Sequence, residues 1–139
     1  MNTNVTPSTE DAGKLVLRAV LAILILFHGI SKLTGGIGMI TGMMAKHGLP
    51  EALGYFVYVG EVLAPLLVLI GFWTRAAALV IVINMLVAIV LVHMGDLFSM
   101  GKTGGWALEL QGMYLGSAIA VALLGAGRYS AGGVAGKWN

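Results

Sequence analysis

Four apolar segments, each close to the length that an α-helix needs to cross a lipid bilayer, dominate this chain of 139 residues. They cover residues 15–33, 52–72, 76–94 and 106–126. A spanning helix requires ~20 mostly apolar residues. Lipid offers no hydrogen-bond partners to the backbone, so only helices and closed β-barrels span membranes. The alternating ~10-residue segments of a barrel are missing. The sequence therefore predicts an all-α, integral membrane four-helix bundle.

The composition favours the same environment. Hydrophobic residues make up 58% of the chain and charged residues 10%, whereas soluble domains carry about 25% charged residues. The net charge of +2 is small and scattered, so the lipid bilayer and not nucleic acid is the expected partner. The chain has no cysteine, which excludes disulfides, thiol redox chemistry and cysteine metal sites within it.

The apolar segments divide the chain into three parts. We expect residues 1–14 to be a flexible polar N-terminus, residues 15–128 a four-transmembrane-helix domain, and residues 129–139 a short C-terminal tail. The N-terminus lacks the basic region and early apolar core of a cleavable signal, so the first apolar segment is expected to stay as an anchor. Only residues 73–75 separate the second and third segments, which predicts an antiparallel hairpin.

The basic residues predict an orientation. Five of them would lie on the side of the two termini: Lys14, Arg18, Arg75, Arg128 and Lys137. Three would lie on the opposite side: Lys32, Lys46 and Lys102. Cytoplasmic loops carry an excess of Lys and Arg, so both termini are expected in the cytoplasm.

Glu61 is the most unusual residue of this pattern, because residues 52–73 are otherwise uncharged. A carboxylate at mid-membrane depth costs at least ~2.5–3.5 kcal/mol on insertion scales. It therefore needs a partner, a proton or a water-filled cavity. We expect Glu61 to be the protonatable and candidate catalytic group of a buried site.

The expected helix directions place other polar residues near Glu61. His28 and Lys32 are four residues apart and share a helix face in the outer half of the membrane. His93 and Glu109 come from the outer ends of the third and fourth helices, and Asn84 lies deeper. The candidate ligand-binding residues are His28, Lys32, Glu61, Asn84, His93 and Glu109.

Five of these candidates also have a purely structural explanation. Lys32 could snorkel to the interface, His28 could be a core histidine, and His93 could be solvated beside Asp96. Glu109 favours a helix N-terminus through the helix dipole. Glu61 itself could form a structural ion pair with Lys32 or a pair with His28.

Several site classes can be compared. A haem between His28 and His93 is disfavoured by their different depths, and a zinc site that adds Glu109 by its spacing, so we expect no metal site. Nucleotide-binding loops and a nucleophile elbow are absent. A pocket with a protonatable acid beside a histidine and a lysine suits a quinone or another ligand with carbonyl acceptors, and suits a proton relay equally.

Small residues recur every fourth position in the fourth segment, at Gly112, Gly116 and Ala120. This spacing permits close helix packing. We expect the three residues to pack within their own bundle, and a contact between subunits of a homo-oligomer is the alternative.

Several short motifs resemble the DoxX family. They are LRAVLAILILFHGISK at 17–32, KHGLP at 46–50, Gly60-Glu61, LIGFWTR at 69–75 followed by AAAL, and GAGRYS at 125–130. The likeness covers roughly residues 15–130, and its matching polar residues are His28, Lys32, Glu61, Arg75 and Arg128. The tail departs from the family's usual Gly-Pro-Gly, which predicts a looser inner end of the fourth helix.

The resemblance implies a multi-pass protein of the bacterial inner (cytoplasmic) membrane. Some members of that family work in redox systems, as a thiosulfate:quinone oxidoreductase subunit or as a membrane partner of superoxide dismutase and a sulfurtransferase. Our first hypothesis is an accessory, quinone-interacting subunit that works with a soluble redox protein. The alternatives are a non-enzymatic membrane scaffold or assembly protein, and a small-molecule permease acting as an oligomer.

Overall fold

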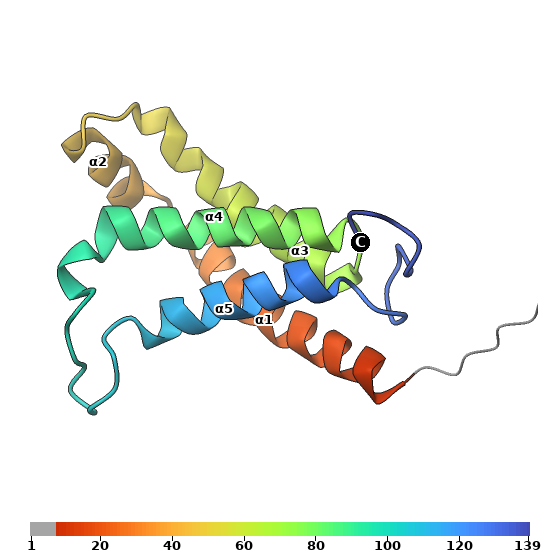
Figure 1. Cartoon of the computed structure of the whole chain (residues 1–139). Coiled ribbons are helices and arrows are strands. Elements are labelled where there is room, and N and C mark those ends of the chain that lie inside the picture. Colours follow the sequence, from red (N-terminus) through yellow and green to blue (C-terminus); the bar gives the residue numbers. More distant parts are fainter. Residues whose placement is uncertain (1–7) are drawn as a thin grey trace, which may run out of the picture.

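The computed structural model describes residues 8–139, whose regular structure is helical (Figure 1). The long elements are α1 (Thr9–Gly35), α2 (Gly38–Lys46), α3 (Ala64–Ile70), α4 (Thr74–Val92) and α5 (Glu109–Leu124). The short ones are two 3₁₀ turns, η1 (Glu51–Phe56) and η3 (Met94–Asp96), and a π-helical turn, η2 (Val59–Leu63). In this part of the chain the only β pairing is an isolated bridge between Met100 and Trp106. The predicted all-α fold is confirmed.

Within residues 8–139, three helical units are long and apolar enough to cross a membrane: α1, the continuous unit Glu51–Ile70, and α4. The fourth, α5, has 16 residues, fewer than the expected segment 106–126. At 1.5 Å per residue it measures ~24 Å, against ~30 Å for a hydrocarbon core. Its expected first turn is a loop instead, because Trp106 pairs with Met100 and its indole donates to the Leu97 carbonyl at 2.8 Å.

The first helix begins earlier than the apolar pattern indicates. The Ser8 hydroxyl accepts from the Asp11 N–H, and the Asp11 carboxylate accepts from the Ser8 N–H, which forms a capping box at Thr9. Residues 9–14 of the expected flexible N-terminus are therefore helical. Residues 1–7, for which flexibility was also expected, lie outside the described residues.

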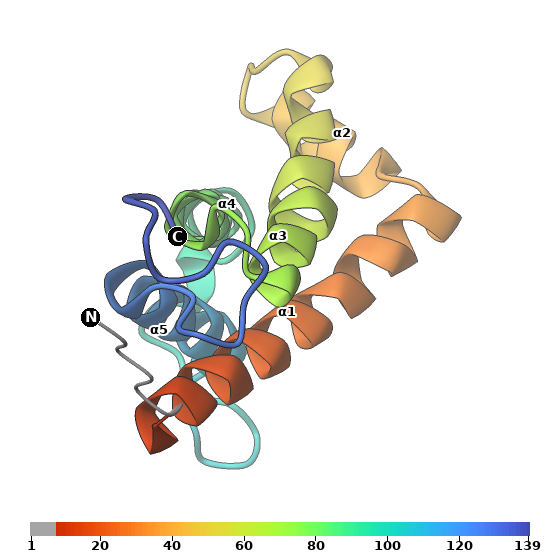
Figure 2. The same ribbon diagram turned by 90° about the vertical axis from the view of Figure 1, so that its right-hand side faces the viewer.

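The four long helical units form a closed ring. The α1 helix packs on α3 and α5, and α4 packs on α3 and α5. Figure 2 shows this arrangement nearly end-on, with α3 between α1 and α4. Alanines let the helices approach closely in the core. The buried core residues include Ala22, Ala64, Ala77, Ala78 and Ala118, with Ile25, Val68 and Ile81 between them. The predicted four-helix bundle and its α3–α4 hairpin are both present.

The small residues of α5 do not pack as expected. The buried face of α5 carries Tyr114, Ala118 and Val121. A Cβ added to Gly116 would meet nothing within 4 Å, and Gly112 faces the Trp106 ring in the preceding loop. The expectation that this stripe packs within its own bundle is wrong for Gly116, which is exposed, whereas Gly112 packs against a ring of the same chain.

Two arginines close the end of the bundle where the chain begins. Arg18 is fully buried and donates to the carbonyls of Val68 and Leu69 at the C-terminus of α3, at 2.8 and 3.3 Å, and to Tyr129 O at 2.5 Å. Arg75 donates to Ala122 O and Leu123 O at the end of α5, at 3.0 and 2.7 Å. The dark blue C-terminal segment crosses this end (Figure 2).

The connection between α1 and η1 is not a plain glycine-rich loop. It contains α2, which packs on η1 and also reaches α4. Figure 1 shows α2 at the end of the bundle away from the C-terminus. This helix closes one side of the space between the two halves of the bundle, where the candidate site lies.

Candidate functional site

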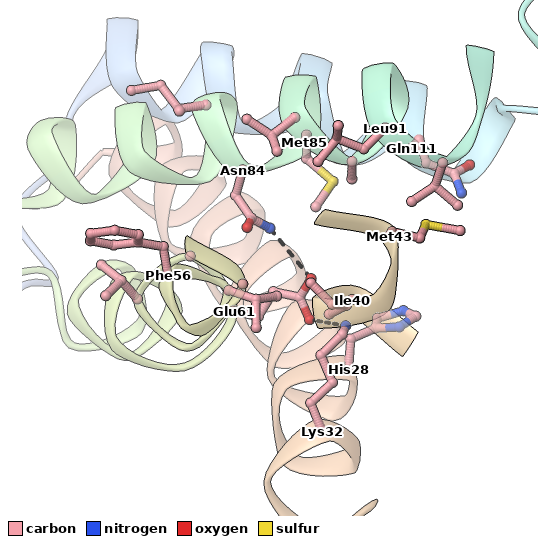
Figure 3. Close-up of a pocket in the computed structure, with 18 of the residues that line it drawn as sticks. His28, Lys32, Ile40, Met43, Phe56, Glu61, Asn84, Met85, Leu91 and Gln111 are labelled. Carbon is pink, nitrogen blue, oxygen red and sulfur yellow. Dashed lines mark hydrogen bonds and ion pairs between the residues drawn. The ribbon is translucent and has the colours of Figure 1, made fainter. Parts of the chain in front are cut away.

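A cavity of about 420 Å³ lies between α1, α2, the η1–η2 segment, α4 and α5 (Figure 3). Its volume falls in the range of ~300–1,000 Å³ that is usual for small-molecule sites. Most of the lining side chains are apolar. The polar or ionisable ones are His28, Lys32, Glu61, Asn84, His93, Gln111 and Tyr114.

The position of Glu61 depends on a local break in helical geometry. Pro65 has no N–H to donate to the carbonyl four residues earlier, which is that of Glu61, and its ring disfavours a regular turn there. The chain instead forms the π-turn η2, in which the Ala64 N–H donates to the Val59 carbonyl. Such turns are frequent at functional sites. Here the turn presents Glu61 at the middle of the unit Glu51–Ile70.

Two glycines bring the neighbouring helices close to this turn. A Cβ on Gly29 of α1 would lie 2.8 Å from the Glu61 carbonyl carbon. A Cβ on Gly60 would lie 2.5 Å from Cγ of Asn84 on α4. Since both approaches require the absence of a side chain, these glycines fix how α1 and α4 meet on either side of Glu61.

The Glu61 carboxylate is buried and paired. Its Oε2 accepts from the Lys32 ammonium, and its Oε1 lies 3.4 Å from the Asn84 amide nitrogen. The Glu61 side chain is 9% exposed and that of Lys32 23% exposed. Figure 3 shows the two dashed contacts meeting at Glu61 from opposite sides. An ion pair held by a third polar group lowers the cost of a charge at this depth.

The imidazole of His28 lies one helical turn before Lys32 and faces α5. Its Nε2 is 3.4 Å from the Tyr114 hydroxyl, and the two rings meet edge to face at 5.9 Å. The Tyr58 hydroxyl donates to the Lys32 backbone carbonyl at 3.2 Å. These contacts orient the face of α1 that carries both His28 and Lys32.

A second polar group lies at the C-terminal end of α4. Gln111 Nε2 is 3.3 Å from His93 Nε2, and His93 Nδ1 is 3.7 Å from the exposed carboxylate of Asp96. The His93 imidazole thus lies between the Gln111 amide on one side and the Asp96 carboxylate on the other. His93 therefore connects the cavity with a surface carboxylate.

The cavity brings together five of the six candidate ligand-binding residues: His28, Lys32, Glu61, Asn84 and His93. Glu109 does not line it. It is the first residue of α5, and its carboxylate lies against the backbone of Gly105 in the preceding loop. The contact of Glu61 with Lys32, one of the two pairings considered, is formed, whereas the structure shows no contact of Glu61 with His28.

Other lining residues were not foreseen. Tyr114 follows Gln111 by three residues, which places both on one face of α5, and this spacing was the available signal. Met39, Met43 and Met44 line the cavity from α2. The helix that carries these methionines was not predicted. Within the described residues, no group of three or more His, Asp or Glu side chains could hold a metal ion.

Comparisons with known proteins identify the family of this chain. Residues 13–94 match the model of the DoxX family. The chain is also 29% identical, over 105 residues, to the Bacillus subtilis (strain 168) protein named "Putative oxidoreductase CatD". That match covers 76% of this chain and 78% of the relative. No solved structure gave a significant match. The matched range includes five of the cavity's polar residues: His28, Lys32, Glu61, Asn84 and His93.

Proposed function

This chain belongs to the DoxX family, and from that premise we propose that it is a quinone-binding accessory subunit of a membrane redox system. Its long apolar helices make it an integral membrane protein. The name of its Bacillus subtilis relative describes an oxidoreductase, which supports a redox role in general terms.

One observation carries the proposal: an apolar cavity of about 420 Å³ whose deep wall holds the Lys32–Glu61 ion pair and the Asn84 amide. Sites of this kind bind apolar ligands and orient them through a few polar groups. A quinone offers a flat apolar ring and two carbonyl acceptors. The Lys32 ammonium and the Asn84 amide supply the donors that such carbonyls need.

The ion pair also suits the chemistry of a quinone. Reduction to the quinol takes up two electrons and two protons. Glu61 in its protonated form would give the first proton to a reduced quinone oxygen, would be reprotonated from the aqueous side, and would then give the second proton. Lys32 would stabilise negative charge on that oxygen before the proton arrives. The chain has no cysteine and no recognised nucleotide-binding loop, so we assign the electrons to a soluble redox protein partner.

The basic residues support an orientation for this work. With both termini in the cytoplasm, Arg18 and Arg75 lie at the inner end of the bundle, and His93 with Asp96 at the outer end. We propose the bacterial inner (cytoplasmic) membrane as the location.

Quinone binding is the direct test. The protein would be purified in nanodiscs and titrated with a quinone, with bound quinone measured by extraction and mass spectrometry. We expect saturable binding with one quinone per chain, weakened by Glu61→Gln and by Lys32→Met. Glu109→Gln removes a carboxylate that lies outside the cavity and should leave binding unchanged. Absence of saturable binding to the unmodified protein would refute the proposal.

A second function is favoured by the same ion pair. The contact of Lys32 on α1 with Glu61 on η2 could serve only to lock the bundle of a membrane scaffold. In that case Glu61→Gln would reduce thermal stability without changing the binding of any ligand. The double variant Glu61→Gln/Lys32→Met, in which both side chains are neutral, would restore full function. If the double variant regains its stability but does not bind quinone, the ion pair has a role in binding beyond stability, which favours the redox subunit over the scaffold.

A further inference from the structure

The walls of the cavity are not equally buried. Its most deeply buried polar side chain, that of Glu61, is 9% exposed, whereas Phe56 of η1 and Ile83 of α4 line it and are 66% and 60% exposed. Val59 and Val87 also line the cavity and are exposed to a smaller extent. We call these four residues, Phe56, Val59, Ile83 and Val87, the lateral rim.

The backbone diverges at this rim. The unit Glu51–Ile70 contacts α4 at Gly60, where the Asn84 side chain occupies the space that a Cβ on Gly60 would need. Beyond that point no Cα of η1 lies within 8 Å of a Cα of α4. Figure 1 shows the yellow segment that leads into α3 turning away from α4. Because the four rim side chains both line the cavity and are exposed, the cavity opens sideways, between the unit Glu51–Ile70 and α4.

The depth of the opening determines what can pass through it. Ile83 is the central residue of α4, whose 19 residues are long enough to span a membrane. Val87 follows one helical turn later. Since all four side chains of the lateral rim are apolar, the opening faces the acyl chains of the bilayer and not the headgroups or water.

On these observations, and resting on the proposed quinone-binding function, we propose that the cavity takes its ligand from the hydrocarbon core through the lateral rim. The ligand class is then a membrane-dissolved quinone with a long hydrocarbon tail. Its ring lies beside Lys32 and Asn84, and its tail leaves between Phe56 and Ile83.

The size of the cavity requires this exit. A volume of about 420 Å³ accommodates a substituted quinone ring, but not a ring together with a tail of many carbons. The tail must leave the protein, and the lateral rim offers apolar contacts that continue into lipid. A water-soluble ligand would gain nothing from such an opening and would enter by the His93 end.

The test compares two ligands that share one ring, a benzoquinone with a decyl tail and the same benzoquinone with a methyl group in place of the tail. Binding is measured in nanodiscs and expressed per mole fraction in the bilayer, which removes the effect of partitioning. Ile83→Trp narrows the rim. We expect it to weaken binding of the decyl quinone by about tenfold or more, with less than about a twofold change for the methyl quinone.

Val90→Trp is the matched control. Val90 lies on the same helix and is 58% exposed, but it does not line the cavity. A second measurement does not depend on a bulky substitution. A benzophenone amino acid at position 83 should crosslink to the decyl tail in competition with unlabelled decyl quinone, whereas the same group at position 90 should give no competed crosslink.

The outcomes separate the two proposals. Binding of both quinones that Ile83→Trp leaves unchanged, with no competed crosslink at position 83, overturns lateral entry and keeps the proposed function. Preference for the methyl quinone at equal mole fraction also overturns lateral entry, in favour of a water-soluble ligand. If the unmodified protein binds neither quinone, the proposed function fails and this inference fails with it.

Discussion

The carbonyl of Glu61 occupies the space that a Cβ on Gly29 would need. This relationship ties α1 to the π-turn at the level of the cavity, because the backbone of one element contacts the backbone of the other. Gly29→Ala must push α1 away from η2 and with it separate Lys32 from Glu61. Overpacking of this kind costs about 1–3 kcal/mol. We expect a lower thermal unfolding midpoint in detergent, measured by circular dichroism.

Gly13 provides the control for that substitution. It lies on the same helix, and an added Cβ would meet nothing within 4 Å. Gly13→Ala should be neutral or stabilise the protein by up to about 1 kcal/mol, since alanine is the better helix former. Equal effects of the two substitutions would contradict the close approach of α1 and η2.

The Lys32–Glu61 ion pair predicts a coupling between two substitutions. Glu61→Gln leaves a partly buried ammonium without its charged partner, and Lys32→Met leaves a buried carboxylate, so each should destabilise by about 1–3 kcal/mol. The double variant removes both charges and should recover part of that loss. The measurement is a double-mutant cycle of unfolding free energies, in which the interaction energy should reach about 0.5–3 kcal/mol. Simple additivity would mean that the two side chains do not interact in the membrane.

Pro65 is expected to control where Glu61 points. Pro65→Ala supplies the N–H that is missing opposite the Glu61 carbonyl and removes the ring that opposes a regular turn. The segment can then continue as an α-helix, which rotates Glu61 relative to Lys32. In this background the Lys32–Glu61 coupling energy should fall toward zero, while Pro50→Ala, which precedes η1 and not the π-turn, should leave it intact. A coupling that survives Pro65→Ala would show that other contacts hold the π-turn.

The four-helix bundle could be predicted from the sequence because the thickness of the membrane sets the length of each apolar segment. The same argument placed Glu61 at mid-depth and His28, Lys32, Asn84 and His93 near it. The argument failed at the helix ends, because a few local hydrogen bonds determine where a helix begins. The capping box of Ser8 and Asp11 extends α1, and the bridge between Met100 and Trp106 shortens α5. Neither contact is visible in hydropathy.

The cavity itself could not be predicted for a related reason. Its shape follows from a π-turn, from two glycine contacts and from α2, a helix of 9 residues in what reads as a glycine-rich loop. Pro65 was a signal for the π-turn, since a proline within an apolar segment removes one helical bond. The position of Tyr114 opposite His28 depends on how α5 rotates, and the small-residue stripe suggested a different rotation.

Arg18 is expected to hold together the end of the bundle where α1 begins. Its guanidinium joins three carbonyls from two segments, Val68 and Leu69 at the end of α3 and Tyr129 in the C-terminal segment. A lysine keeps the charge but lacks the planar fork, so it cannot reach both segments at once. We expect Arg18→Lys to destabilise the protein by about 2–3 kcal/mol and to expose the segment after α5 to proteolysis.

Lys102→Met, in the exposed loop before α5, serves as the control for handling and purification. The measurement is limited proteolysis with mass spectrometry. In Arg18→Lys, cleavage after Arg128 should increase at temperatures where the circular dichroism signal of the helices is still unchanged. If the helices and the C-terminal segment are lost together, Arg18 stabilises the whole bundle and does not act as a local tie.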